Sequence, residues 1–200
     1  MIELYDRYSQ ESRDLHESLV ATGLSQLGVG IDADGFLPDG LVSPFTYYLG
    51  YEKGKPLYFN QVPVPAFWEI SGNNQSARIE DMTQERALIH YADGMQARLV
   101  KQVDWKDLEG RVRQVDHYKR FGACFATTTF SADSEPVMTV YQDVNGQEVL
   151  LENHVTGDIL LTLPGQSIRY FANKVEFITF FLQDLELDKH QIVFNTLATH

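Results

Sequence analysis

The chain has 200 residues, of which 44% are hydrophobic, so it is long enough to bury the core of one domain with a small appendage. Its 16 Lys and Arg residues and 28 Asp and Glu residues give a net charge of -12, which disfavours nucleic acid or an anionic membrane as a partner. Between Arg98 and Arg120, however, seven basic residues outnumber four acidic ones. This local excess is typical of exposed strands with solvated side chains; the alternative is a docking surface for an acidic partner.

The only cysteine, Cys124, cannot form an internal disulfide, and its apolar neighbours predict a buried, unreactive thiol in a reducing compartment. The first residues are charged where a signal peptide needs an apolar core, and no stretch approaches about 20 apolar residues. We therefore expect a cytoplasmic protein with at most peripheral membrane association.

The chain opens with the pattern of a βαβ unit. Residues 2–5 predict a short strand, Ser9 can cap a helix that runs to about Thr22, and residues 27–32 form the next apolar run. Gly23 supplies the left-handed residue that commonly ends a helix. The second strand should lie parallel to the first, so an α/β sheet begins here.

A long connection follows the opening unit. Residues 34–55 are rich in turns and aromatic residues, and residues 56–70 are expected to be extended because Pro63 and Pro65 alternate with Val62 and Val64. Residues 71–74 predict a turn. The polar residues 78–85 predict either an edge strand or a loop.

The middle of the chain predicts an antiparallel β-meander. Turn sequences such as Asp93-Gly94 and Asn145-Gly146, which favour the positive φ of hairpin turns, separate segments rich in Val, Tyr, Phe and Thr. The predicted strands cover residues 87–91, 95–103, 111–121, 123–130, 136–144, 147–153 and 158–163. In residues 111–118 apolar side chains do not alternate cleanly, so we expect a sheet open on much of both faces, which another molecule covers.

The end of the chain returns to an α/β pattern. Pro164-Gly165 should end the meander, Asn173 and Glu176 have the spacing of a capping box, and the helix that follows is apolar almost all round. Residues 191–195 predict a last strand. The expected fold is therefore α+β and β-rich: an extended antiparallel meander inserted into a partial Rossmann-like α/β sheet made from both chain ends. The expected domains are residues 1–55, 56–165 and 166–200.

Sequence motifs give little support for autonomous catalysis. Asp32 and Asp34 follow an apolar strand and could chelate a divalent cation, although Asp34-Gly35 is also a common turn. The six histidines lack metal-site spacing, and no glycine-rich phosphate loop is present, so no cofactor is expected. Four aromatic residues could stack on a sugar or a peptide, or could simply pack in the core or at an edge: Trp68, Trp105, Tyr118 and Phe121.

Several separated segments carry a resemblance to a known family. They are YDRYSQESRDLHESL, DADGFLPDG, SPFTYYLG, KPLYFNQVPVPAFWEI and the closing IVFNTLAT. Together they resemble the N-terminal part of the glycosylation-stabilising subunit of the accessory Sec pathway. That family is the non-catalytic, chaperone-like B subunit of a two-subunit transferase, which attaches GlcNAc to Ser and Thr of serine-rich repeat adhesins.

The resemblance implies a partner and a surface. The partners would be the catalytic A subunit and the serine-rich acceptor polypeptide, and the meander would contribute to subunit association. We place the partner or acceptor surface at six residues: Arg111, Arg113, His117, Tyr118, Trp105 and Trp68. Subunits of this family continue beyond the last strand, so the chain is expected to be a fragment in which His200 is vector-derived. The alternatives are a metal-dependent glycosyltransferase using Asp32 and Asp34, or a β-rich carbohydrate-binding module.

Overall fold

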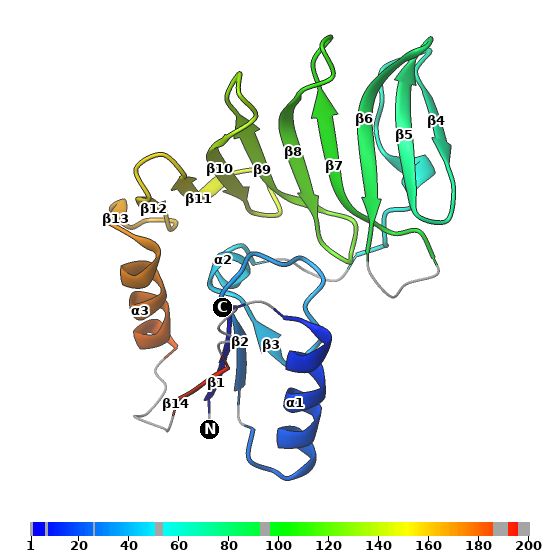
Figure 1. Cartoon of the computed structure of the whole chain (residues 1–200). Helices are drawn as coiled ribbons and strands as arrows, with labels where there is room; N and C mark the ends of the chain where they lie inside the picture. The colour runs from blue at the N-terminus through cyan, green and yellow to red at the C-terminus, as the bar shows by residue number, and fades with distance from the viewer. Residues whose placement is uncertain are drawn as a thin grey trace.

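The computed structural model describes residues 2–6, 8–25, 27–50, 54–92 and 97–185, together with the backbone of residues 192–195. These residues form two sheets, a small parallel one and a large antiparallel one that stands beyond it (Figure 1). The predicted Asp93-Gly94 turn and the start of the predicted strand 95–103 lie outside the described residues. Within the described part, no helix combines the length and the apolar character needed to cross a membrane.

The parallel sheet contains strands from both ends of the chain. Its order is β14-β1-β2-β3, with β1 at Ile2–Tyr5, β2 at Leu27–Gly30, β3 at Leu41–Val42 and β14 at Ile192–Asn195. β1 pairs in parallel with both β2 and β14, as the strand–helix–strand pattern predicts. Helix α1, at Gln10–Ala21, crosses between β1 and β2, and the Ser9 side chain accepts from the backbone N–H of Ser12 at its start.

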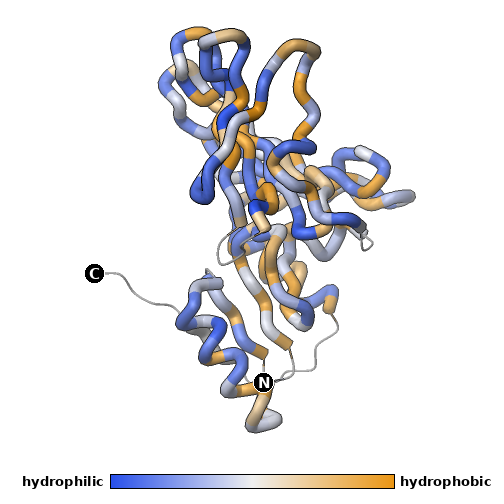
Figure 2. Tube along the Cα trace, turned by 90° about the vertical axis from the view of Figure 1, so that its right-hand side faces the viewer, coloured by the Kyte–Doolittle hydropathy of each residue, from blue (hydrophilic) through white to orange (hydrophobic). Residues whose placement is uncertain are grey.

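The antiparallel sheet has ten strands that follow one another in chain order from β4 to β13. They are β4 Glu69–Gly72, β5 Ser76–Asp81, β6 Gln84–Tyr91, β7 Val100–Lys106, β8 Val112–Tyr118, β9 Cys124–Phe130, β10 Pro136–Gln142, β11 Glu148–Asn153, β12 Ile159–Leu161 and β13 Arg169–Phe171. The β-rich fold, with its meander between the two ends of the chain, is therefore confirmed. Seen from the side, hydrophobic and hydrophilic stretches are mixed throughout the part of the molecule beyond the parallel sheet (Figure 2).

Three local predictions can be compared with the structure. The turn predicted at residues 71–74 lies at residues 73–75 between β4 and β5, and the polar segment 78–85, left open between a strand and a loop, contributes to the paired strands β5 and β6. The expected end of the meander at Pro164-Gly165 was wrong, because the meander continues into β13. A strand of three residues such as β13 is too short to show a period of two, so only pairing with β12 defines it.

The two halves of the meander are covered on opposite faces. Across β8 to β11, His117, Ala126, Tyr141 and Leu150 lie side by side on one face, and the helices pack on that face through Phe177. On the other face, the strands β5 to β7 bury Ala77, Ile79, Ala87, Ile89 and Val103 beneath the segment that contains Val62. Each half is therefore covered on one face, and no residue of the central strand β8 is fully exposed, so the expectation of a sheet open on much of both faces was not met there.

Two short helices and one longer helix connect the layers. α2 at Pro44–Tyr47 and the 3-10 helix η1 at Phe59–Gln61 were not predicted, whereas α3 at Lys174–Asp184 was. Asn173 accepts from the N–H of Glu176, and Glu176 accepts from the N–H of Ala172. Phe177 and Phe181 of α3 are fully buried but Val175 is 72% exposed, so the expectation of burial on several sides was wrong.

Cys124 is exposed at the start of β9, so the expectation of a buried thiol was wrong. Partial burial of the sulfur nevertheless raises the pKa of the Cys124 thiol to about 11. The thiol is therefore protonated at neutral pH and is a poor nucleophile.

Candidate functional site

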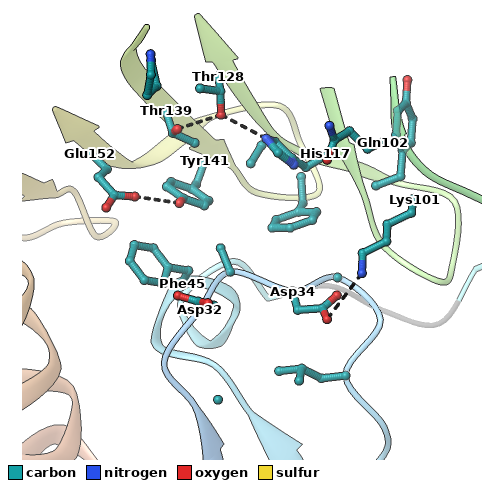
Figure 3. A pocket seen from close by; sticks show the side chains of 18 of the residues that line it. Asp32, Asp34, Phe45, Lys101, Gln102, His117, Thr128, Thr139, Tyr141 and Glu152 are labelled. Carbon is teal, nitrogen blue, oxygen red and sulfur yellow. Dashed lines mark hydrogen bonds and ion pairs between the residues drawn. The ribbon is translucent and has the colours of Figure 1, made fainter. Parts of the chain in front are cut away.

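A cavity of about 570 Å³ lies where the meander meets the parallel sheet. Its roof is formed by side chains of β7 to β11, and its floor by the loop that follows β2 and by Phe45 of α2 (Figure 3). The loop after β2 leaves the carboxyl end of a parallel strand, which is where ligands commonly bind in α/β sheets. We therefore take this junction cavity as the candidate site.

A chain of hydrogen bonds crosses the roof of the junction cavity. His117 Nε2 lies 3.0 Å from Thr128 Oγ1, which lies 2.8 Å from Thr139 Oγ1, and Thr139 Oγ1 lies 2.7 Å from His154 Nε2. Thr128 and Thr139 are direct cross-strand neighbours, so the sheet register itself aligns the two hydroxyls. Burial lowers the pKa of His117, so its imidazole is neutral at pH 7.

A second polar pair stands beside this chain. The buried Tyr141 hydroxyl donates to Glu152 over 2.9 Å, and its ring lies 5.1 Å from the ring of Phe45. Burial and the neighbouring carboxylate of Glu152 raise the pKa of Tyr141 well above its ordinary value. Tyr141 therefore keeps its proton and presents a hydrogen-bonding hydroxyl beside an aromatic floor.

The two carboxylates of the floor face lysines. Asp32 Oδ1 lies 3.1 Å from Lys174 Nζ, and Asp34 Oδ2 lies 3.9 Å from Lys101 Nζ. The two ammonium groups balance the negative charge of Asp32 and Asp34, which a divalent cation would otherwise do. Among the residues described here, no group of three His, Cys, Asp or Glu side chains is placed to hold a metal ion. The chemistry of these donors therefore does not fit the metal-dependent alternative.

Gly35 allows the floor to approach the meander closely. A Cβ atom at this position would lie 2.3 Å from the carbonyl oxygen of Tyr118 and 2.8 Å from the ring of Phe125. The backbone N–H of Arg120 donates to the carbonyl of Gly35, and the guanidinium of Arg120 pairs with Asp39. The Asp34-Gly35 sequence is thus needed for contact between the two sheets.

The structure separates the six residues that the sequence analysis placed on one surface. His117 and Tyr118 line the junction cavity. Trp105 packs against the core of β4–β7 and donates its Nε1–H to Asp116 over 2.7 Å. Trp68 packs against the same core, with the guanidinium of Arg86 5.2 Å from its ring.

Arg111 and Arg113 lie at the far end of the meander, and both lie close to acidic residues of the turn between β7 and β8. Arg111 pairs with Asp107 and Glu109 at 3.0 and 3.2 Å, and Arg113 Nε lies 3.9 Å from Asp107. Arg113 also donates to the carbonyl of Ser131. Much of the local basic excess is therefore neutralised locally, as for solvated strand ends.

Sequence reasoning missed most of the residues that give the junction cavity its polarity. They come from different strands and from α3, namely Lys101, Thr128, Thr139, Tyr141, Glu152, His154 and Lys174. Polar residues within apolar strands, such as Thr128 and Thr139, were the only available signal. That signal does not indicate which face of the sheet a residue occupies.

The fold and the cavity define the class of protein: an α+β protein whose long meander is inserted into a parallel sheet and meets it at a polar cavity. Two family models match the sequence, the GtfB N-terminal domain at residues 2–48 and the GtfB middle domain at residues 68–172. The middle-domain match alone covers more than half of the 200 residues. The chain belongs to the GtfB family.

Relatives extend this finding over the whole chain. A Streptococcus pneumoniae protein named UDP-N-acetylglucosamine–peptide N-acetylglucosaminyltransferase stabilizing protein GtfB is 89% identical over 199 residues, covering 100% of this chain and 45% of its own length. The protein of the same name from Streptococcus gordonii is 52% identical and covers 99% of this chain and 44% of its own length. The chain therefore spans less than half of these relatives.

A solved structure agrees with the fold. It is the crystal structure of a GtfA/B complex bound to UDP and GlcNAc, in which a chain 52% identical to this one superposes with a TM-score of 0.95. The match covers 99% of this chain and 45% of that chain. The relatives carry the name of a stabilising protein, which distinguishes them from the transferase that they stabilise.

Proposed function

We propose that this chain is part of the non-catalytic stabilising subunit of a protein O-GlcNAc transferase, and that it works in the cytoplasm. In this proposal the subunit holds a Ser/Thr-rich acceptor polypeptide, as in serine-rich repeat adhesins, and associates with a catalytic GtfA subunit. The observation that carries the proposal is the 89% identity, across the whole chain, to a protein named as a transferase-stabilising GtfB.

The chemistry of the junction cavity supports acceptor binding. The neutral imidazole of His117, the threonine hydroxyls and the Tyr141 hydroxyl offer both donors and acceptors, and Phe45 provides an apolar floor. Such a lining suits the hydroxyl side chains and amide groups of a Ser/Thr-rich peptide. Asp32 is paired with Lys174 and Asp34 with Lys101, so the charges on the cavity floor are balanced within the protein. The ligand therefore does not need to carry a charge.

The test measures binding of the purified chain to GtfA and, separately, to a synthetic Ser/Thr-rich peptide. We expect both complexes at micromolar concentrations. The variant Thr139→Val should weaken peptide binding while leaving GtfA binding unchanged, because it breaks the hydroxyl chain of the cavity. Thr129→Val is the matched control, since Thr129 lies next to Thr128 on the opposite face of β9.

Absence of a GtfA complex would contradict the assembly role, and equal peptide affinities for Thr139→Val and Thr129→Val would contradict the cavity as acceptor site. A glycan array probed with the same chain distinguishes this proposal from a carbohydrate-binding module, which would bind free glycans but not the peptide. The double charge reversal Arg111→Glu/Arg113→Glu tests the surface expected from sequence. That assignment fails if neither interaction changes.

A further inference from the structure

The hydrogen-bonded side chains in the roof of the junction cavity end in two histidines with different surroundings (Figure 3). His117 is half-buried in β8, whereas His154 is exposed in the turn between β11 and β12. The hydroxyls of Thr128 and Thr139 connect them, and these two threonines are only 7% and 4% exposed. We refer to His117, Thr128, Thr139 and His154 as the hydroxyl chain.

The number of protons on the hydroxyl chain restricts its direction. Three hydrogen bonds of 3.0, 2.8 and 2.7 Å join four atoms, and each bond needs one proton. The two threonine hydroxyls supply one proton each, so at least one imidazole donates through Nε2. If both imidazoles donated, one buried hydroxyl proton would lack an acceptor, because neither hydroxyl has a further acceptor among the residues described. A fully bonded hydroxyl chain therefore has one donating and one accepting imidazole.

The direction of the hydroxyl chain decides what His117 offers to a ligand. Its Nε2 is bonded to Thr128, whereas its Nδ1 has no hydrogen-bond partner in the described part of the protein and is not enclosed. The ring lines the cavity and, being neutral at pH 7, carries one proton. When Nε2 donates to Thr128, Nδ1 accepts from a ligand. When Nε2 accepts from Thr128, Nδ1 holds the proton and donates to a ligand.

Protonation of His154 leaves only one of these two directions. A protonated imidazole carries a proton on both nitrogens, so Nε2 of His154 then donates to Thr139. Thr139 must donate to Thr128, and Thr128 must donate to Nε2 of His117. Nδ1 of His117 becomes a donor, and a ligand O–H or N–H can no longer bond to it.

We propose that His154 determines the specificity of the junction cavity, because its protonation decides through the hydroxyl chain whether His117 accepts a hydrogen bond from the ligand or donates one. The ligand side of this inference rests on the proposed function, in which the cavity holds a Ser/Thr-rich peptide. Glu152 already accepts from Tyr141, and the carboxylates of the floor pair with lysines, so Nδ1 of His117 is the acceptor that remains for a peptide hydroxyl. His154 touches no ligand in this arrangement and is a positioning residue.

Other charged groups also face the hydroxyl chain. Two carboxylates act on His117 from within the sheet, Asp104 and Asp116. Five charged residues line the cavity itself: Asp32, Asp34, Lys101, Glu152 and Lys174. These groups stay the same when His154 alone is replaced. The comparison of the unmodified protein with a variant at residue 154 therefore isolates the contribution of His154.

The first test follows the tautomer of His117 by NMR of the 15N-labelled protein between about pH 8 and pH 5.5, where histidines usually change charge. We expect the Nδ1–H form of neutral His117 to increase as His154 gains its proton. The change should disappear in His154→Gln, whose amide can donate or accept but cannot be protonated. It should also disappear in Thr139→Val, which cuts the hydroxyl chain, and persist in the control Thr129→Val.

The second test measures affinity for the synthetic Ser/Thr-rich peptide at the same two pH values. We expect the unmodified protein to bind at least about fivefold more weakly at the lower pH, as for coupled sites, and His154→Gln to lose this difference. A constant His117 tautomer, or a tautomer change of equal size in Thr139→Val, would overturn the inference. An equal loss of affinity in His154→Gln would overturn it as well. If no form binds the peptide, the proposed function fails, and the NMR test still decides whether His154 controls His117.

Discussion

His90 and His117 lie in one row across the sheet, with Gln102 of β7 between them, yet their surroundings act on them in opposite directions. A hydrogen bond from His90 to Asp104, 2.7 Å long, raises the pKa of His90 above 6.5. Burial lowers the pKa of His117 below the same value. The two imidazoles therefore contribute to stability at different pH.

The sign of each contribution follows from linkage. The His90 contribution is complete below the unfolded pKa and is lost as the pH rises through the raised folded pKa. For His117, the pKa is higher in the unfolded chain than in the folded chain, so on acidification the unfolded chain takes up the proton first. The free energy of unfolding therefore falls as the pH drops from 6.5 towards the lowered folded pKa. Acidification thus favours the His90 contact and disfavours the buried His117.

We predict that NMR titration of the imidazole protons will show His90 titrating above pH 6.5 and His117 below it. The variant Asp104→Asn should return His90 towards 6.5, because it removes the hydrogen-bonded charge, and should leave His117 as the more acidic group. Identical midpoints for the two residues would contradict the opposite environments seen here.

Helix α3 is the element that covers the meander next to the junction cavity. Phe177 is completely buried, and its ring lies 5.3 Å from that of Phe45 and 5.4 Å from that of Phe171. The helix therefore joins α2 to the last strand of the sheet through one aromatic cluster. Deleting the central ring should leave a cavity that the surrounding strands cannot close.

We predict that Phe177→Ala will lower the free energy of unfolding by about 3–5 kcal/mol, as measured by urea denaturation. Val175→Ala, on the exposed side of the same helix, is the control and should change it by less than about 0.5 kcal/mol. Equal losses for the two variants would show that the aromatic cluster does not hold the helix on the sheet.

At the scale of the whole molecule, stability depends on the contact between the two sheets. The loop after β2 reaches the turn between β8 and β9 through Gly35, whose missing side chain makes room for Tyr118 and Phe125. The Arg120–Asp39 and Lys101–Asp34 ion pairs also join this loop region to the meander. Gly35, Tyr118 and Phe125 line the junction cavity as well.

We predict that Gly35→Ala will destabilise the protein by about 1–3 kcal/mol, because a methyl group there must displace backbone atoms of the meander. Gly30→Ala is the control: its Cβ would meet Leu37 at 3.4 Å, an ordinary contact, and should cost less than about 1 kcal/mol. Thermal unfolding of both variants checks the difference, and a Gly35→Ala protein as stable as Gly30→Ala would refute it.

Local chemistry explains which predictions from the sequence were confirmed. Ser9 and Asn173 each cap a helix through a neighbouring N–H, and Asn145-Gly146 forms its turn between β10 and β11. Such signals need only a few consecutive residues, so they survive in any tertiary context. The sequence left β5 undecided between a strand and a loop because this segment is rich in charged residues. It missed β13 because three residues are too few to show a period of two.

By itself, the sequence determined most of the meander strands, the Asn145-Gly146 turn and both helix caps, because turn and capping preferences are local. Only the tertiary structure decided which face each half of the meander buries. That choice brings Thr128, Thr139, Tyr141 and Lys174 into one cavity and leaves Phe67 and Met82 exposed at the far end. Residues that meet only through sheet register and packing across the fold share no spacing that a sequence can display.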